Sequence, residues 1–141
     1  MKPFTIERTY NAPADLVWKA ITQKELMKQW YFDLKEFKAE VGFVFEFTGG
    51  PASDRQYLHH CEITEVIPGK KLKHSWSYVN YEGMSYVTFE LFPEGNKTKL
   101  KLTHEGLDTF PISNPDFAPS NFELGWTQII GTSLKEFVEN K

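Results

Sequence analysis

Residues 120–138, SNFELGWTQIIGTSLKEFV, predict the element around which the fold is organised. Large apolar side chains recur in this stretch at three- and four-residue steps, and that spacing places them on one broad stripe of an α-helix. The stripe consists of Phe122, Trp126, Ile129, Ile130, Leu134 and Phe137. Most polar side chains fall on the opposite side. We therefore predict one long amphipathic helix whose apolar face packs on the rest of the chain.

The start and the middle of this helix carry further signals. Ser120 and Glu123 fit a capping box, in which the serine hydroxyl accepts from the Glu123 amide and the carboxylate reaches back. Gly125, Gly131 and Ser133 are small residues in the helix interior, where each glycine costs about 1 kcal/mol relative to alanine. Such residues either let another backbone approach closely or leave space beneath the helix. We expect Ser133 to point at the sheet.

The composition limits both the fold and the function. The chain has 141 residues, enough for a single domain (1–141) with a substantial core. Its aromatic content of 16% means that a small number of helices and strands can fill that core, because each aromatic side chain buries a large area. The net charge of −3, without a basic cluster, argues against nucleic-acid binding, which depends on cationic contacts to phosphate. Cys61 is the single cysteine, so no internal disulfide can form. No stretch has the ~20 apolar residues of a membrane span and no signal peptide is evident, so we expect a cytoplasmic protein.

The remainder of the chain predicts an α+β fold. An alternating strand at 4–10 is followed by two short helices, one opened by Pro13 and the other by a second capping-box pattern from Thr22 to Glu25. Hairpin-type turns then separate six further strands, which should be antiparallel neighbours. Their predicted ranges are 34–38, 41–48 (ended by Gly49-Gly50-Pro51), 57–66, 72–79, 84–92 and 98–104. The irregular segment 105–119 has the length of a lid or a rim.

The order of the elements and several short motifs resemble the START-like, or SRPBCC, superfamily. The motifs are Asn11-Ala12-Pro13 before Val17-Trp18, Trp30-Tyr31-Phe32, Gly69 between paired strands, and Gly125-Trp126 in the last helix. Within the superfamily, the chain is similar to the branch homologous to the activator of the heat-shock-protein-ninety ATPase, although Val41-Gly42 replaces the Gly-Gly pair often found there. The resemblance implies a helix-grip fold, in which a curved antiparallel sheet of about seven strands surrounds the last helix and leaves a cavity.

Centring each hairpin turn predicts which side chains of the sheet face the helix, because the turn fixes the register. The predicted rows across four strands are Ile63–His74–Phe89–Leu100, Cys61–Trp76–Val87–Leu102 and His59–Tyr78–Ser85–His104. The first two rows are mainly apolar and should pack against the helix. The third row is polar and lies toward loops 48–56 and 105–119, so we interpret it as the mouth of the cavity.

Two kinds of chemistry are disfavoured by this arrangement. His59, His60 and Cys61 are consecutive, so their side chains alternate between the two faces of the strand. His104 is about 14 Å from His59 at ~4.8 Å per strand, too far to share a metal ion. Ser85 and His104 imitate a serine–histidine pair, but no carboxylate is placed to orient the histidine. We therefore expect no metal, no cofactor and no catalysis; a cyclase- or hydrolase-like enzyme is a further alternative.

An aromatic pocket with a few polar groups is the usual form of a small-molecule site, so we predict binding of a small, largely apolar ligand. The predicted binding residues are Trp30, Phe45, Phe47, Tyr57, His59, Cys61, His74, Trp76, Tyr78, Ser85, Val87, Phe89, Leu102, His104, Trp126 and Ile130. The resemblance adds a second hypothesis, a co-chaperone-like module that binds a chaperone in a stress response. A filled core is the structural alternative. The sequence leaves the oligomeric state open between monomer and homodimer.

Overall fold

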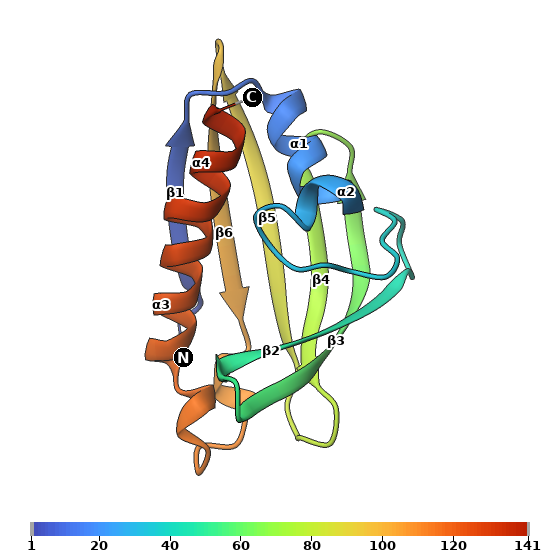
Figure 1. Cartoon of the computed structure of the whole chain (residues 1–141), viewed down its shortest axis with the longest axis vertical. Helices are drawn as coiled ribbons and strands as arrows, with labels where there is room; N and C mark the ends of the chain where they lie inside the picture. Colours follow the sequence, from blue (N-terminus) through green and yellow to red (C-terminus); the bar gives the residue numbers. More distant parts are fainter. Residues whose placement is uncertain (1, 141) are drawn as a thin grey trace.

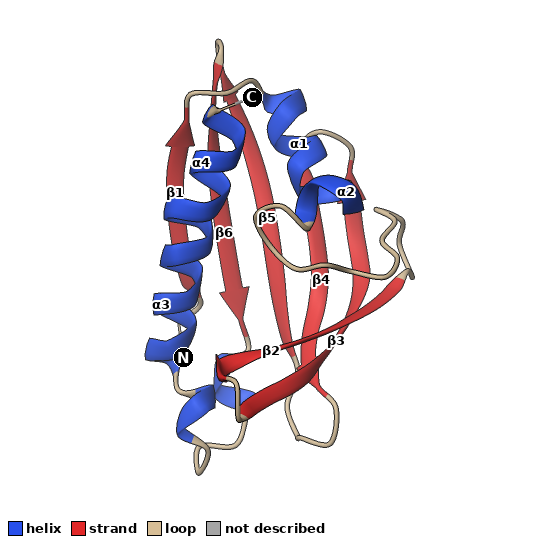
Figure 2. Cartoon of the chain, in the orientation of Figure 1, coloured by secondary structure: helices blue, strands red, loops and turns tan. Residues whose placement is uncertain are grey.

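The computed structural model describes residues 2–140 and has the predicted α+β, helix-grip architecture. Six strands form an antiparallel sheet in the order β1-β6-β5-β4-β3-β2, and the C-terminal helix lies against one face of it (Figures 1 and 2). The strands are β1 (Phe4–Tyr10), β2 (Val44–Ala52), β3 (Arg55–Ile67), β4 (Lys71–Tyr78), β5 (Ser85–Glu94) and β6 (Lys97–Glu105). The sheet is curved, and β2 with the adjoining half of β3 crosses below the two short N-terminal helices in Figure 1.

The helices cover the same side of the sheet (Figure 2). They are α1 (Ala14–Thr22), α2 (Lys24–Met27), two 3₁₀ turns, η1 (Leu107–Thr109) and η2 (Pro115–Phe117), and the long C-terminal helix. That helix consists of α3 (Pro119–Gln128), a π-helical segment η3 (Ile129–Ser133) and α4 (Leu134–Glu139). Trp30 follows α2 and donates its indole N–H to the Ala20 carbonyl of α1 at 2.9 Å, which fixes the two short helices together.

The buried face of the C-terminal helix confirms the predicted apolar stripe. Its fully buried side chains recur at four-residue steps, and Ile129 and Phe137 lie half-buried beside them. The buried set is Phe122, Trp126, Ile130, Leu134 and Val138. Where the helix widens into its π-helical turn, the Ile130 carbonyl accepts a hydrogen bond from the Tyr10 hydroxyl at 2.7 Å, so β1 satisfies a backbone group in the irregular turn.

Neither predicted capping box forms. The long helix begins at Pro119, so Ser120 is already helical and cannot act as the N-cap. Asn121 bonds the preceding turn instead, through its side-chain amide and the Pro115 carbonyl at 2.8 Å. Thr22 is the last residue of α1, and its hydroxyl donates back to the Trp18 carbonyl at 2.6 Å rather than capping α2.

Two strand predictions are corrected by the structure, which has six strands rather than seven. Residues 34–38 form no strand, because Leu34 and Phe37 both enter the core, and a spacing of three does not fit strand alternation. Strand β2 begins at Val44 and continues through the two glycines that were expected to end it, with a register shift between Gly49 and Ala52. A Cβ on Gly50 would lie 1.9 Å from a backbone oxygen of β3, so only glycine permits this approach.

The predicted register is confirmed between β3 and β4, where His59 lies opposite Tyr78 and Ile63 lies opposite His74. It is wrong by two residues at the next two pairings. Trp76 pairs with Ser85 rather than Val87, which also removes the predicted Tyr78–Ser85 pair. Val87 pairs with His104 rather than Leu102, so Ser85 does not lie directly opposite His104. Of the predicted polar row, His59 and Tyr78 therefore lie at the mouth, whereas Ser85 and His104 lie further inside.

The turns explain the shift. Strands β5 and β6 are joined by the two-residue loop Gly95-Asn96, with Gly95 at a positive φ of 67°, so Pro93 and Glu94 remain in the ladder. Moving the centre of a hairpin by one residue moves its register by two. Between β4 and β5, the Met84 amide leaves the ladder and donates to the Thr109 hydroxyl at 2.9 Å. The connection therefore packs against loop 105–119 instead of forming a symmetric turn.

Candidate ligand-binding site

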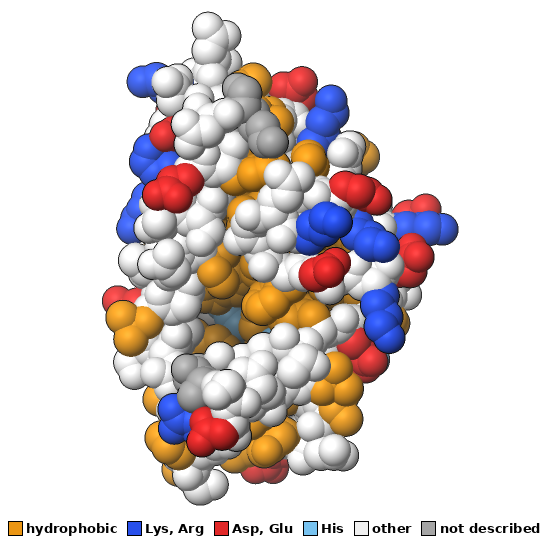
Figure 3. Space-filling model, viewed as in Figure 1, with side chains coloured by type: hydrophobic (Ala, Val, Ile, Leu, Met, Phe, Trp, Pro, Cys, Tyr) orange, Lys and Arg blue, Asp and Glu red, His pale blue; other side chains and the backbone are white. Residues whose placement is uncertain are grey.

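A cavity of about 230 Å³ lies between the first half of the C-terminal helix and the β2–β3 hairpin. In the space-filling view it is a hollow with largely apolar walls and a histidine side chain at its floor (Figure 3); the histidine among the lining residues is His59. We call it the mouth cavity. Its lining residues are Phe32, Gly49, Gly50, His59, Trp76, Tyr78, Asp116, Asn121, Phe122, Gly125, Trp126 and Ile129.

Glycines create part of this space. Gly125 is exposed and lines the cavity, and a Cβ on it would find no atom within 4 Å, so it faces open space at the mouth. A Cβ on Gly49, on the other wall, would lie 3.1 Å from the Phe32 ring. The sequence left two roles open for the small helical residues, and at Gly125 the structure shows unfilled space. At Gly131 a Cβ would make ordinary contact, 3.5 Å from the Arg8 side chain.

Ser133 was predicted to point at the sheet, but in the structure it does not. It lines a separate surface hollow together with Trp30 and Tyr31, between the helix and the segment after α2. The prediction assumed a regular α-helix, whereas Ser133 ends a π-helical turn, which changes the direction of the side chains in that turn. The unfilled part of the grip is therefore at the N-terminal half of the helix.

His59 presents a hydrogen-bond acceptor to the mouth cavity. Its Nδ1 lies 3.0 Å from the Tyr57 carbonyl and 3.2 Å from the Phe47 carbonyl. Carbonyl oxygens only accept, so Nδ1 bears the proton and Nε2, on the far side of the ring, has a lone pair. Burial lowers the pKa of His59 to about 4, against which the two carbonyl contacts act only partly, so the ring is neutral at pH 7.

Trp76 and Tyr78 are two residues apart on β4 and therefore share a face. The Trp76 indole N–H donates to the Tyr78 hydroxyl oxygen at 2.9 Å. The Tyr78 O–H is then available to donate, and within residues 2–140 it makes no hydrogen bond of its own. Burial raises the pKa of Tyr78, so the hydroxyl keeps its proton at neutral pH. The cavity thus has a neutral acceptor and a neutral donor on neighbouring strands.

A buried chain of hydrogen bonds forms the wall behind the cavity. The Trp126 indole N–H donates to Nδ1 of His104 at 3.0 Å, so the His104 proton is on Nε2. Nε2 donates to the Ser85 hydroxyl at 2.8 Å, and that hydroxyl donates to the Trp76 carbonyl at 2.8 Å. Burial lowers the pKa of His104 to about 3, which keeps this arrangement neutral.

This direction of hydrogen bonding does not suit nucleophilic catalysis. A general base must accept the serine proton, but here His104 donates to Ser85 and its other nitrogen faces an indole N–H rather than a carboxylate. Both side chains are fully buried. The geometry assigns Ser85 and His104 to holding Trp126 and β4 in place.

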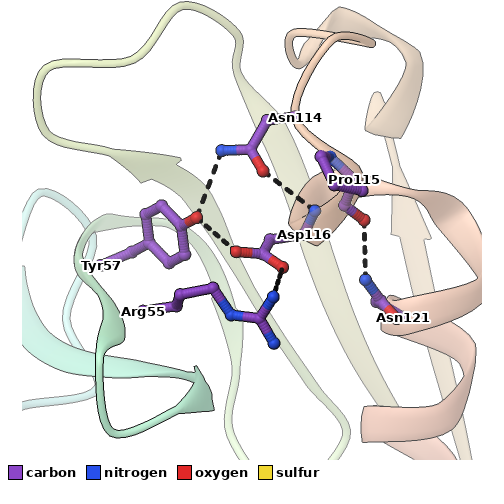
Figure 4. Close-up of polar contacts among 6 residues, drawn as sticks. All are labelled: Arg55, Tyr57, Asn114, Pro115, Asp116 and Asn121. Carbon is purple, nitrogen blue, oxygen red and sulfur yellow. Dashed lines mark hydrogen bonds and ion pairs between the residues drawn. The ribbon is translucent and has the colours of Figure 1, made fainter.

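A network of polar side chains closes the rim beside the cavity (Figure 4). The Tyr57 hydroxyl donates to the Asp116 carboxylate at 2.6 Å and accepts from the Asn114 side-chain amide at 3.2 Å. Arg55 lies 3.6 Å from the other Asp116 oxygen, and the Asp116 amide donates to the Asn114 side chain at 2.9 Å. We call these four residues the rim network. They join the β2–β3 hairpin to the segment just before the long helix.

The structure brings four of the sixteen predicted binding residues to the mouth cavity, namely His59, Trp76, Tyr78 and Trp126. Tyr57 lies beside it in the rim network, and Phe47 stacks behind His59 with ring centroids 4.4 Å apart. The others lie deeper, with Trp30, Phe45, His74 and Phe89 around a void of about 10 Å³. Cys61, Ser85, Val87, Leu102, His104 and Ile130 are buried and do not line the mouth cavity.

The residues that sequence reasoning missed come mainly from outside the strands. Phe32, Asp116 and Asn121 lie in loops or at the helix start, where no periodicity predicts the direction of a side chain. Tyr31 was quoted only as part of a motif, yet its hydroxyl is buried and has no hydrogen-bond partner within residues 2–140. Tyr31 borders the void of about 10 Å³, which has room for one water molecule at most.

Metal binding finds no support in the part of the chain that the structure describes, where no three His, Cys, Asp or Glu side chains are grouped to hold an ion. Cys61 is fully buried, and desolvation raises the pKa of its thiol, so it is an unreactive core residue. Within residues 2–140, no helix is both long and apolar enough to cross a membrane.

The family model described as Activator of Hsp90 ATPase homolog 1-like protein matches residues 11–139. The chain belongs to this family. The match confirms the resemblance to the SRPBCC superfamily, and it supports a ligand-binding or co-chaperone-like domain. A comparison with curated proteins found no match.

Solved structures share the fold of this chain over almost its whole length. MLL2253 from Mesorhizobium loti is 25% identical with a TM-score of 0.80, covering 99% of this chain and 98% of its own. BH1534 from Bacillus halodurans is 25% identical with a TM-score of 0.76, covering 99% and 98% respectively. DynU16, a protein of the dynemicin biosynthetic locus, is 20% identical with a TM-score of 0.78, covering 99% of this chain and 48% of its own; this likeness concerns the fold alone.

Proposed function

We propose that this domain binds a small, largely apolar molecule in the mouth cavity. The observation that supports the proposal is the unfilled space of about 230 Å³ inside the helix grip. Other surface hollows of the chain are larger, but the walls of this one are mainly apolar and include Trp76 and Trp126, with a few polar groups among them, which is the usual make-up of a small-molecule site. It suits a domain that holds a ligand.

The volume and the walls define the ligand. An apolar cavity of about 150 Å³ is enough to bind benzene, so 230 Å³ suits a molecule of one or two rings. Trp76 and Trp126 lie with ring centroids 5.5 Å apart and offer flat apolar surface. We therefore expect a compact, flat ligand rather than a long acyl chain, held mainly by burial of its apolar surface.

The proposal is tested by titrating the protein with 2-methoxynaphthalene, a neutral two-ring probe. Binding should change the fluorescence of Trp76 and Trp126 and should raise the melting temperature, because a ligand that binds only the native state stabilises it. Absence of both effects across a series of neutral aromatic probes would contradict the proposal.

A pair of leucine variants tests the location. Gly125→Leu places a side chain in the cavity, and Gln128→Leu places the same side chain on the exposed face of the same helix. We expect Gly125→Leu to abolish binding of 2-methoxynaphthalene and Gln128→Leu to leave it unchanged. Equal binding by the two variants would show that the probe binds elsewhere.

A second candidate function is binding of a chaperone, as in the name of the family. Ile112, in loop 105–119, is 97% exposed and Leu124, on α3, is 70% exposed, so two large apolar side chains are available for a protein contact. Calorimetry with Hsp90, comparing the native chain with the double variant Ile112→Ser, Leu124→Ser, tests this candidate. No heat of binding with the native chain would exclude it. Either function would fit the cytoplasmic location that we expect.

A further inference from the structure

We infer that the ligand of the mouth cavity is uncharged and has a hydroxyl group that bonds to both His59 and Tyr78, an inference that rests on the proposed function. His59 and Tyr78 lie directly opposite each other on β3 and β4, with ring centroids 4.7 Å apart. Both line the cavity. One residue offers a lone pair and the other offers a proton, so a single ligand group can meet both.

The acceptor is defined by the backbone around His59. Its Nδ1 proton is shared between the carbonyls of Tyr57 and Phe47, at 3.0 and 3.2 Å, and this leaves Nε2 without a proton. The ring is held in that orientation by stacking on Phe47 at 4.4 Å and by an edge contact with Trp76 at 4.9 Å. His59 therefore offers its acceptor in one fixed direction.

The donor is defined by Trp76. Because its indole N–H occupies one lone pair of the Tyr78 oxygen, the Tyr78 hydroxyl is oriented, and its proton has no acceptor within residues 2–140. A ligand in the cavity would shield both groups from water, and polar groups that are shielded without a partner are costly. A hydroxyl on the ligand donates to Nε2 of His59 and accepts from the Tyr78 O–H, and it completes both bonds at once.

The charges around the cavity exclude a carboxylate ligand. Asp116 is the charged side chain among the lining residues, and it is 8% exposed. Arg55, which lies 3.6 Å from Asp116, is not part of the lining. An anionic ligand would meet the Asp116 carboxylate and the His59 lone pair, and no cationic side chain among the lining residues would offset this. A neutral hydroxyl avoids this repulsion.

Three probes with the same ring system separate these contributions. They are 2-naphthol, which donates and accepts, 2-methoxynaphthalene, which only accepts, and 2-naphthoate, which is anionic. We expect 2-naphthol to bind about tenfold more tightly than 2-methoxynaphthalene, since one buried hydrogen bond is at stake. We expect 2-naphthoate to bind more weakly than either. Affinities are measured by tryptophan fluorescence and calorimetry.

Variants assign the preference to the two residues. His59→Phe keeps an aromatic ring and removes the acceptor, so the affinity ratio of 2-naphthol to 2-methoxynaphthalene should fall to about one. His59→Gln restores an acceptor and should recover part of the ratio. Tyr78→Phe should lower the affinities for 2-naphthol and 2-methoxynaphthalene by similar factors, because both probes accept a hydrogen bond from the Tyr78 hydroxyl. Circular dichroism verifies that each variant is folded.

The outcomes separate this inference from the proposed function. Equal affinities of 2-naphthol and 2-methoxynaphthalene for the native chain would overturn the inference and leave the cavity as a ligand site. An unchanged tenfold ratio in His59→Phe would also overturn it. If no probe binds the native chain, the proposed function falls together with the inference. The comparison of probes on the native chain requires no variant, so a variant that fails to fold does not prevent the test.

Discussion

The two ends of the helix–sheet interface differ in how they are filled. Toward the C-terminus, Ile130, Leu134 and Val138 are buried against the sheet, whereas Gly125, near the other end, faces unfilled space. Both ends have the same apolar periodicity. The stripe has large side chains at both ends, and the hollow opens beside it, where Gly125 has no side chain. A cavity can therefore open where a small residue flanks a filled apolar stripe.

The two ends also differ in polarity. Among the described residues, the filled end has one buried side-chain hydrogen bond between helix and sheet, from the Tyr10 hydroxyl to the Ile130 carbonyl. The hollow end contains His59, Ser85 and His104, all buried and uncharged. Buried polar groups require defined partners, so they fix the positions of the large rings that surround the space. We expect the hollow end to be sensitive to pH and the filled end to be sensitive to side-chain volume.

The largest expected effect is the loss of stability in mild acid. Burial lowers the pKa of His59 and His74 to about 4 and that of His104 to about 3. These values lie below the unfolded histidine pKa of about 6.5. At a pH between the folded and the unfolded pKa, the unfolded chain therefore binds more protons than the folded chain. The free energy of unfolding should therefore fall as the pH drops below about 6.5, by up to about 4 kcal/mol per pH unit where all three titrate.

Urea unfolding curves at several pH values measure this effect. Between pH 6.5 and 5 the carboxylates are still largely ionised, so the histidines dominate the slope in that range. In His59→Phe the slope should be about one third smaller, because one of the three groups is removed. A flat dependence between pH 6.5 and 5 would mean that these histidines are accessible to water in the folded protein.

The next effect concerns the filled end. Leu134→Ala removes a fully buried side chain and should cost about 2–5 kcal/mol, since the neighbouring strands cannot collapse onto the gap. Binding of 2-methoxynaphthalene to the folded variant should be unchanged, because Leu134 does not line the mouth cavity. Urea melts and fluorescence titration measure the two quantities. A loss below 1 kcal/mol would show that this end is loosely packed as well.

A smaller effect is expected at the rim. Tyr57→Phe removes the hydroxyl that bonds to Asp116 and Asn114 and should cost about 1 kcal/mol, the net value of such hydrogen bonds. Because the rim network joins the β2–β3 hairpin to the helix start, ligand exchange should also become faster. Stopped-flow fluorescence compares the dissociation rates of the native chain and the variant. Identical rates would show that the rim network does not limit entry to the cavity.

The fold was largely predictable because its signals are repeated along the chain. The helix stripe from Phe122 to Leu134 and the alternation of Phe45 and Phe47 each rest on several residues. The predicted short strand at 34–38 was wrong because two apolar side chains, Leu34 and Phe37, are too few to distinguish a strand from a loop that enters the core. Both capping boxes were wrong for a related reason, since a shift of one residue at α2 and of two at α3 in the helix start removes the geometry that the motif needs.

The candidate site was predictable only in part. His59 and Tyr78 were placed together correctly, although a bulge between Ile63 and Glu65 shifts the register between the turn and this pair by one residue. Ser85 and His104 were misplaced by two residues because the following turns are shorter or less symmetric than their composition suggests. Phe32 and Asp116 were not predicted at all, since loop side chains are positioned by tertiary contacts such as those of the rim network.

The central claim, that the grip is hollow at one end, is tested most directly by the stability of Gly125→Leu. In a hollow grip the leucine enters empty space and replaces a residue that costs about 1 kcal/mol in a helix, so the free energy of unfolding should rise by about that amount. In a filled grip the same leucine overpacks the core and should cost about 1–3 kcal/mol. Urea melts of the native chain, Gly125→Leu and the exposed control Gln128→Leu measure the free energy of unfolding, and the sign of its change distinguishes the two cases. A gain in Gly125→Leu together with the loss of 2-methoxynaphthalene binding supports the account, and a clear loss of stability contradicts it.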